Sequence, residues 1–290
     1  MSVDDLGPFI RSRREALSPV EVGLPEGPRR RTPGLRRSEL AMLAGISVEY
    51  LVRLEQGRDT RPSAQVVTSL ANALRLGVDD RTHLRQLVLC GQGGDLCADH
   101  LPPATEVRPS VRAILDRLEP APALVLNGLS DILAWTSGYQ PIGEAVGILD
   151  GRPPNLLRYT FTDPRARTTY PDWSRVADEQ VANLRSLLRP GIVDDETLLT
   201  ELNERAGDEF TRRWAAQQVQ AKRTGTKRLE HPLVGELRLV FETLTLPDAD
   251  HQRLVVYLPA DDDTARALDR LSGRQPGQLR AVDAERQAAG

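Results

Sequence analysis

The stretch Ser38-Glu-Leu-Ala-Met-Leu-Ala-Gly-Ile-Ser-Val-Glu-Tyr-Leu-Val-Arg-Leu-Glu-Gln-Gly-Arg58 decides the fold of the first part of this chain. Ala41 supplies the small side chain that is needed where two helices cross, and Gly45, four residues later, suits a tight turn. Leu51 and Leu54 then place apolar side chains on one face of a second helix. This register predicts two short helices that pack across a turn, the helix-turn-helix arrangement.

Further short helices are predicted on both sides of this stretch. Apolar spacing and helix-ending residues favour helices at 6–17, 36–44, 48–56, 63–74 and 80–89. Ser47 is expected to cap the third of these helices and Gly57 to end it. Residues 18–34 contain four Pro, three Gly and the run Arg29-Arg30-Arg31, which indicates an exposed loop. The alternative is a buried helical segment with chance Ala and Gly spacing, and the flanking helices count against it.

The charge of the chain is unevenly distributed. The whole chain carries a net charge of −3, yet residues 1–92 hold 14 Arg against 11 acidic residues. A basic segment on an acidic body is typical of a protein in which one domain meets a polyanion. A solvated basic face is the alternative reading of the same charge. Only two of the 38 basic residues are Lys, which points to a GC-rich bacterial genome.

The remainder of the chain has a mixed pattern that follows a Gly- and Pro-rich linker. We expect domains at residues 1–92 and 104–272, a linker at 93–103 and a disordered tail at 273–290. Helices are predicted at 110–118, 172–188, 194–219 with a break near Gly207-Asp208, and 262–271. Strands are predicted at 123–127, 132–136, 227–231, 235–246 and 253–258, the first two as a hairpin. This order favours an α+β domain with helices on one face of the sheet.

Several classes of protein are disfavoured. No stretch approaches the roughly 18 consecutive apolar residues of a membrane span. The acidic start of the chain has no apolar segment after it, so we expect no secretory signal. Cys90 and Cys97 lie too far apart for a short zinc-binding pair, and two thiols make no disulfide framework. We therefore expect a cytoplasmic, nucleoid-associated protein with reduced cysteines.

Catalytic signatures are missing from the sequence. The four histidines, His83, His100, His231 and His251, have no metal-binding spacing, and no nucleophile elbow or phosphate-binding loop is present. Gly91-Gln-Gly-Gly94 follows a helix and is better explained as linker. His231 precedes a proline at the end of a strand, where a structural imidazole is favoured over a general base. We expect no catalytic residue, no metal and no cofactor.

The decisive stretch resembles the helix-turn-helix of the XRE class of bacterial regulators. The closer resemblance is to MmyB-type regulators, and it covers roughly residues 5–272. The segments that carry it are the loop at 18–34, Gly34-Leu-Arg-Arg, Tyr50-x-x-Arg-Leu-Glu-Gln-Gly-Arg58, Asn127-Gly-x-x-Asp-Ile-Leu-Ala-Trp135, Leu156-Leu-Arg-Tyr-x-Phe-Thr-Asp163, Tyr170-Pro-Asp-Trp173, Arg213-Trp214 and Thr226-Lys-Arg-Leu-x-His-Pro-x-x-Gly-Glu-Leu237. The resemblance implies an all-α, five-helix XRE-type domain followed by a PAS-like α+β domain with an antiparallel sheet. It also implies that the second domain binds a small apolar ligand of acyl or fatty-acid-like type.

DNA-contacting residues are expected on and beside the second helix of the motif. With Leu51 and Leu54 turned inward, the outward positions of that helix enter a major groove. By resemblance, Val48, Glu49 and Arg53 stand where base edges are read, and Arg can form two hydrogen bonds with guanine. The full predicted set is Arg36, Arg37, Ser47, Val48, Glu49, Val52, Arg53, Gln56 and Arg58, with the arginines at 36, 37 and 58 as phosphate contacts.

We expect different roles for two other sets of arginines in this region. Arg14 and Glu55 are expected to form a structural ion pair between helices, as in this class. Arg29–Arg31 either reach a groove or only keep the loop soluble. We expect the protein to bind operator DNA as a homodimer, with half-sites about one helical turn apart.

The ligand pocket is expected among the large apolar residues of the second domain. By resemblance, the predicted lining is Trp135, Leu156, Leu157, Tyr159, Phe161, Trp173, Phe210, Trp214, Leu239 and Phe241. For each of these residues taken alone, ordinary core packing is the favoured reading. The chain departs from the family where Trp135 is followed by Thr136 rather than Asn. Three hypotheses stay open for this domain: a ligand sensor, a module that only dimerises or docks a partner, and a cryptic enzyme.

Overall fold

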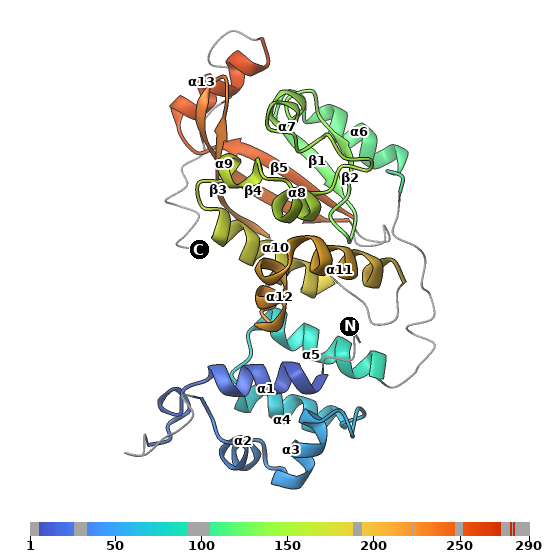
Figure 1. The fold of residues 1–290 in the computed structure, drawn as a ribbon, viewed down its shortest axis with the longest axis vertical. Coiled ribbons are helices and arrows are strands. Elements are labelled where there is room, and N and C mark those ends of the chain that lie inside the picture. Colours follow the sequence, from blue (N-terminus) through green and yellow to red (C-terminus); the bar gives the residue numbers. More distant parts are fainter. Residues whose placement is uncertain are drawn as a thin grey trace.

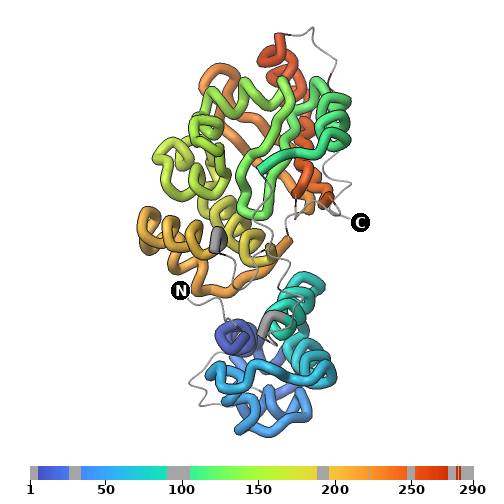
Figure 2. The backbone as a smooth tube through the Cα atoms, turned by 90° about the vertical axis from the view of Figure 1, so that its right-hand side faces the viewer, coloured from blue at the N-terminus to red at the C-terminus, as the bar shows by residue number. Residues whose placement is uncertain are grey.

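The computed structural model describes residues 6–25, 34–91, 105–187, 193–221, 223–246 and 252–273, together with Leu279 and Ala281. The predicted linker, the run Arg29–Arg31 and most of the predicted tail therefore lie outside the described residues. A helical N-terminal region occupies one end of the long axis, and a larger domain built on a sheet occupies the other (Figures 1 and 2). Leu279 packs against the core of the larger domain.

All five predicted helices are present in the N-terminal region. They are α1 (Leu6–Ala16), α2 (Arg37–Ala44), α3 (Val48–Glu55), α4 (Ala64–Ala73) and α5 (Val78–Gly91), with a short 3-10 turn at Val20–Val22. Their apolar faces meet in one core that includes Phe9, Ile10, Leu40, Leu51, Leu54, Leu70 and Leu84. Because these helices are short, burial of this shared face rather than helix propensity stabilises them.

The turn between α2 and α3 has the geometry that the sequence predicts. Gly45 has a φ of 66°, in the left-handed region that favours glycine. The N–H of Ile46 donates to the carbonyl of Ala41 at 3.0 Å, which closes the last turn of α2. The hydroxyl of Ser47 accepts from the N–H of Tyr50 at 3.1 Å and so caps α3.

The larger domain contains a five-stranded antiparallel sheet. Its strands are β1 (Ala123–Leu126), β2 (Ile132–Trp135), β3 (Thr224–His231), β4 (Gly235–Thr245) and β5 (Arg253–Pro259), in the order β2-β1-β5-β4-β3. Every neighbouring pair is antiparallel, and β1 and β2 form the predicted hairpin. The architecture is thus the predicted helical region followed by an α+β domain.

Helices cover both faces of the sheet, so the prediction of a single covered face was wrong. On one face, α6 (Pro109–Arg117) packs Val111 and Leu115 against Val125 and Leu254. The opposite, inner face carries the alternate residues of the same strands and forms the larger core. All four residues of β1 are buried, which is the mark of a strand covered on both sides. A continuous apolar run such as β1 does not show from sequence alone which helices cover each of its two faces.

The helices of the inner face were only partly predicted. Three short ones, α7 (Gln140–Val146), α8 (Leu156–Thr162) and α9 (Ala166–Thr169), were missed. The longer helices are α10 (Trp173–Leu187), α11 (Val193–Ala206), α12 (Asp208–Ala215) and α13 (Asp262–Leu271). The predicted break falls at Gly207, whose φ is 56°. The helix predicted to reach residue 219 ends at Ala215, because Gln217 takes a φ of 55° that no helix continues through.

Candidate DNA interface and ligand pocket

A buried ionic cluster fixes α3 on the N-terminal region. The Nε of Arg14 donates to Oε1 of Glu55 at 2.6 Å, which confirms the predicted ion pair between α1 and α3. The Nε of Arg37 donates to the other carboxylate oxygen, also at 2.6 Å. Arg14 further donates through Nη1 to the carbonyl of Leu35 at 2.8 Å. One carboxylate therefore ties α3 to both α1 and the start of α2.

Close backbone contact holds α1 and α3 together beside this cluster. A Cβ added to Gly7 would lie 2.5 Å from the carbonyl oxygen of Glu55, far inside van der Waals contact. Only glycine lets the two helices approach this closely. The outward face of α3 is thus set on a rigid base.

The predicted DNA-contacting residues form an exposed surface along α3 and at the start of α2. Val48, Glu49, Arg53, Gln56 and Arg58 are exposed, and Val52 is half-buried. The guanidinium of Arg53 lies 5.4 Å from the centre of the Tyr50 ring and 3.9 Å from a carboxylate oxygen of Asp59.

Three predicted residues also have a structural use. Ser47 caps α3 through its hydroxyl, and Arg37 is bound to Glu55 through Nε while its side chain stays partly exposed. Arg36 is exposed at the N-terminus of α2, where its backbone N–H donates to the carboxylate of Glu39 at 2.7 Å.

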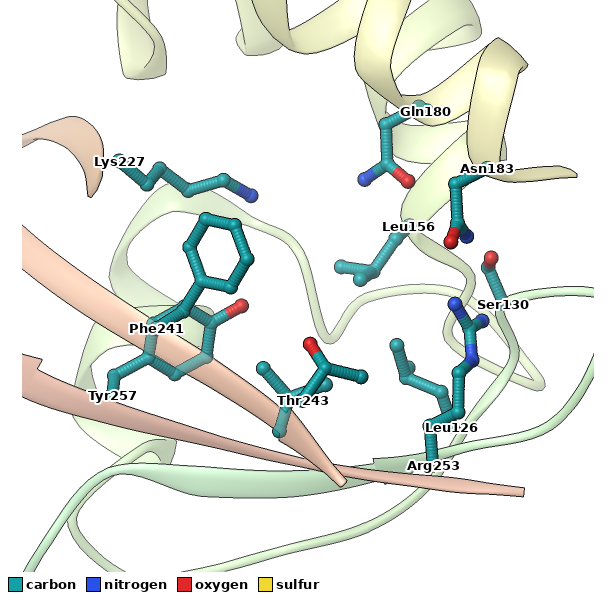
Figure 3. Close-up of a pocket in the computed structure, with 11 residues that line it drawn as sticks. Leu126, Ser130, Leu156, Gln180, Asn183, Lys227, Phe241, Thr243, Arg253 and Tyr257 are labelled. Atoms are coloured by element: carbon teal, nitrogen blue, oxygen red, sulfur yellow. The ribbon is translucent and has the colours of Figure 1, made fainter. Parts of the chain in front are cut away.

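The larger domain contains a small cavity on the inner face of the sheet (Figure 3). Its free volume is about 20 Å³, room for about one water molecule. The residues that line it are Leu126, Ser130, Leu156, Gln180, Asn183, Lys227, Phe241, Thr243, Arg253, Val255 and Tyr257. Sequence reasoning predicted only Leu156 and Phe241 from this set. It missed the polar half, because those side chains come from α10, three strands and a turn that only the fold brings together.

The other eight predicted pocket residues lie in apolar cores. Leu157, Phe161, Phe210 and Trp214 pack in a cluster between α8, α10, α11 and α12, with Phe210 stacked on Trp214 at 5.8 Å between ring centres. Trp135, Tyr159, Trp173 and Leu239 pack in the core on the sheet. The indole N–H of Trp173 donates to the carbonyl of Thr160 at 2.9 Å.

A second cavity adjoins the first across a phenylalanine ring. Its free volume is about 70 Å³, and it is lined by Arg175, Glu179, Gln220, Ala221, Arg223, Thr224, Gly225 and Phe241. Phe241 is the one residue common to both linings. Its ring lies directly on Gly225, where an added Cβ would be 3.0 Å from Cζ. Glycine at 225 therefore leaves room for the ring that separates the two cavities.

The segment that lines the second cavity also contacts the N-terminal region. Asp79 of α5 accepts from the backbone N–H of Ala221 at 3.2 Å and from the guanidinium of Arg223 at 3.1 Å. Arg13 of α1 donates to the carbonyl of Gln217 at 2.6 Å, and Val219 packs against the N-terminal core. The chain between α12 and β3 thus connects the N-terminal region to the wall of the cavities.

A buried histidine lies close to this contact. His83 of α5 meets the ring of Phe9 edge-on at 5.2 Å between ring centres. Burial, with the nearby positive charges of Arg185 and Arg13, lowers the pKa of His83 to about 3, so the imidazole is neutral at pH 7.

His231 has the structural role that the sequence favours. Its Nδ1 accepts from the N–H of Leu233 at 3.2 Å, and its Nε2 lies 3.3 Å from the carbonyl oxygen of Pro141. Among the described residues, no group of three His, Cys, Asp or Glu could hold a metal ion. Within the same ranges, no helix is long and apolar enough to cross a membrane.

The fold and its two sites define a class of protein in which a helix-turn-helix domain is joined to a ligand-binding domain. Residues 5–84 match the helix-turn-helix domain family, and residues 107–271 match the MmyB-like transcription regulator ligand binding domain. The chain therefore belongs to the MmyB-like transcription regulators. No curated protein matches the chain. Both matched families are regulatory domains rather than enzymes.

Proposed function

We propose that the protein binds operator DNA through the outward face of α3 and that a small molecule in the C-terminal domain changes this binding. One observation carries the proposal. Within five residues, the chain runs from Arg223, which contacts Asp79 of the N-terminal region, to Lys227, which lines the cavity. A ligand that moves this part of β3 acts on the DNA-binding region through a short, rigid connection.

The proposed DNA contacts divide into base-reading and phosphate-binding residues. Val48, Glu49 and Arg53 read base edges, and Ser47, Val52 and Gln56 lie beside them on the same helix. Arg36, Arg37 and Arg58 hold phosphates on either side of the groove. Exposure of this surface and its positive charge support the assignment. Two copies of the chain place two α3 helices in half-sites about one turn apart.

The proposed ligand is a small molecule of acyl type that occupies the cavity on the inner face of the sheet. The apolar half of the lining suits the carbon skeleton of such a molecule, and the polar half fixes its orientation. Because the free volume is only about 20 Å³, a larger ligand must displace a side chain. Phe241 is the side chain whose movement joins this cavity to its neighbour of about 70 Å³.

The ligand affects DNA binding only if it binds two states of the protein with different affinity. Movement of Phe241 off Gly225 alters the edge of β3 that precedes Lys227. The contact between Asp79 and Arg223 then changes the placement of α5, and with it the N-terminal region. Occupancy of the cavity and operator affinity are thus linked reciprocally.

The small volume of the cavity favours a second candidate function. In that alternative the C-terminal domain binds no ligand and serves only to dimerise or to dock a partner protein. The two candidates differ in whether the freshly purified protein carries a small molecule.

The test is native mass spectrometry of the full-length protein, followed by denaturation and identification of any released compound. A stoichiometric extra mass, together with an operator affinity that changes when the compound is removed, supports the ligand-responsive regulator. The operator is obtained by selection from random duplex DNA with the same protein. A mass equal to that of the chain alone, with no compound released on denaturation, supports the association module instead.

A further inference from the structure

The arginine that is proposed to read bases, Arg53, lies between two side chains that were not predicted to act at the DNA interface. Its guanidinium is 5.4 Å from the centre of the Tyr50 ring, and its Nη2 is 3.9 Å from Oδ2 of Asp59. Tyr50 precedes Arg53 on α3, and Asp59 follows the helix. In Figure 1, α3 lies at the end of the molecule that is remote from the larger domain, so that domain does not cover this group of three side chains.

The turn after α3 places Asp59 beside Arg53. Gly57 has a φ of 68°, in the left-handed region in which glycine ends a helix and turns the chain back. The N–H groups of Arg58 and Asp59 then both donate to the carbonyl of Arg53, at 2.9 and 3.3 Å. The carboxylate is oriented as well, because its Oδ1 accepts from the N–H of Arg61 at 3.3 Å while Oδ2 faces Arg53. The backbone of α3 thus fixes the position of the carboxylate.

Tyr50 provides an aromatic surface on the other side of Arg53. Its ring packs against the N-terminal core and is half-buried. Residues three apart share a face of a helix, and a cation beside an aromatic face is attracted by the ring. Burial, followed by the charge of Asp59, raises the pKa of Tyr50 above its ordinary value, so the phenol stays neutral.

These contacts position Arg53 without using its hydrogen-bond donors. A separation of 3.9 Å exceeds a hydrogen bond, and the guanidinium donates none within the part of the chain that the structure describes. The side chain is 55% exposed. A carboxylate at this distance offsets much of the attraction between Arg53 and more distant phosphates. It leaves free the N–H groups that guanine accepts through O6 and N7.

We propose that Asp59 and Tyr50 are specificity-determining residues, which hold Arg53 in position for a base edge and keep it from binding phosphates. Without the carboxylate, Arg53 can turn to the DNA backbone, where a contact carries no sequence information. The inference rests on the proposed function, because it concerns how Arg53 distinguishes bases at the same interface.

The test is Asp59→Asn in the full-length protein. Asn keeps the Oδ1 that accepts from the N–H of Arg61 and removes only the charge. Fluorescence anisotropy gives the specificity ratio, which is the affinity for the selected operator divided by that for a random duplex of equal length. We expect affinity for the random duplex to rise and the ratio to fall by about twofold to fivefold. Glu15→Gln removes an exposed carboxylate of α1 that is paired with Arg11, and it should leave the ratio unchanged.

The aromatic side is tested by a pair of variants at position 50. Tyr50→Leu removes the ring and should lower the specificity ratio by about twofold to fivefold, whereas Tyr50→Phe keeps the ring and should preserve the ratio. Asp59→Asn and Tyr50→Leu are then repeated in Arg53→Ala, where neither should lower the ratio further. If Tyr50→Leu fails to fold, Asp59→Asn with its control still decides the question.

Three outcomes would overturn the inference. An unchanged ratio in Asp59→Asn, while Arg53→Ala relaxes base preference, would reject the role of Asp59 and leave the proposed function intact. A ratio that falls equally when Arg53 is already alanine would make Asp59 a structural residue. If Arg53→Ala itself retains full base preference, the proposed register of α3 is wrong, and this inference fails together with it.

Discussion

The N-terminal region and the C-terminal domain each bury an arginine, but the two arginines differ in their hydrogen-bond partners. Arg14 is buried against the carboxylate of Glu55 and the carbonyl of Leu35, so most of its donors are matched within the same region. Arg253 is buried with one carbonyl partner and no carboxylate within the described residues. A matched buried charge fixes one packing of the helices, whereas a buried charge without a carboxylate partner is costly to the fold. The N-terminal region thus gains rigidity from its buried arginine, whereas the C-terminal domain bears the cost of one.

The largest effect is expected when the matched cluster is broken. Glu55→Gln leaves Arg14 buried without an opposite charge and removes an acceptor from Arg37. We expect the free energy of unfolding of the N-terminal region to fall by about 3–5 kcal/mol, as for other broken buried pairs. The measurement is urea unfolding followed by far-ultraviolet circular dichroism.

Glu49→Gln, on the exposed face of the same helix, is the matched control and should cost less than about 0.5 kcal/mol. A Glu55→Gln protein as stable as the wild type would show that the cluster does not hold α3. The matched charge of Arg14 would then contribute no more to stability than the charge of Arg253.

The N-terminal region was predictable because its order is local. Gly45, Ser47 and the inward leucines of α3 lie within ten residues of one another, so their spacing alone sets the turn and the buried face. The ion pair between Arg14 and Glu55 spans 41 residues and was expected only from the family resemblance. The second arginine that donates to that carboxylate, Arg37, was predicted only as a contact to a DNA phosphate.

The ligand cavity was not predictable in the same way. The prediction favoured large aromatic residues, and the fold uses most of these, such as Phe210 and Trp214, to pack helices against one another. The cavity instead collects Arg253 from β5, Lys227 from β3 and Gln180 from α10. A basic residue beginning an apolar strand, as in Arg253-Leu-Val-Val-Tyr, was the available signal. Strand alternation would have placed Arg253 on the face of Val255, but only the sheet order shows that this face is covered.

An exposed arginine gives the next effect, on DNA binding rather than on folding. Arg53 is more than half exposed and has no carboxylate closer than 3.9 Å among the described residues, so its guanidinium is available to a base. Arg53→Ala is expected to cost about 1–3 kcal/mol at one base pair of the selected operator and to relax base preference there. The measurement is fluorescence anisotropy with the operator and its single-base variants.

Arg58→Ala serves as the comparison in the same experiment. It should weaken all sequences alike and lower the salt dependence of binding by about one phosphate contact. If Arg53→Ala retains full base preference, the outward register of α3 is not the one that reads DNA.

Acid is expected to lower the free energy of unfolding through His83, which is buried close to the contact between the two regions. Because burial holds its pKa at about 3, below the unfolded value of 6.5, the neutral form is favoured in the folded state. This contribution is complete above pH 6.5 and is lost as the pH falls toward 3. Between pH 7.5 and 5 the free energy of unfolding should fall by about 2 kcal/mol. Urea unfolding of the wild type and of His83→Leu at both pH values measures it.

The difference between the two proteins isolates His83, because every other titrating group is common to both. His231, whose pKa is also lowered by burial, is one such group. An equal pH dependence in His83→Leu would mean that the pKa of His83 is not lowered in the folded protein.

The smallest effect concerns the contact that joins the two regions. Asp79→Ala removes the acceptor of the Ala221 N–H and of the exposed Arg223 guanidinium, and the cost in stability should be only about 1 kcal/mol. The informative result is which domain responds to the substitution.

Although Asp79 lies in α5, Asp79→Ala should lower the urea midpoint measured by the tryptophans of the C-terminal domain. Val78→Ala, at the neighbouring position, should leave that midpoint unchanged. Glu55→Gln, by contrast, should affect the circular dichroism transition far more than the tryptophan signal. A double-mutant cycle with Arg223→Ala then gives the energy carried by the ion pair itself. If Asp79→Ala does not change the tryptophan transition, the two regions fold independently, and a ligand in the C-terminal domain would need another route to α3.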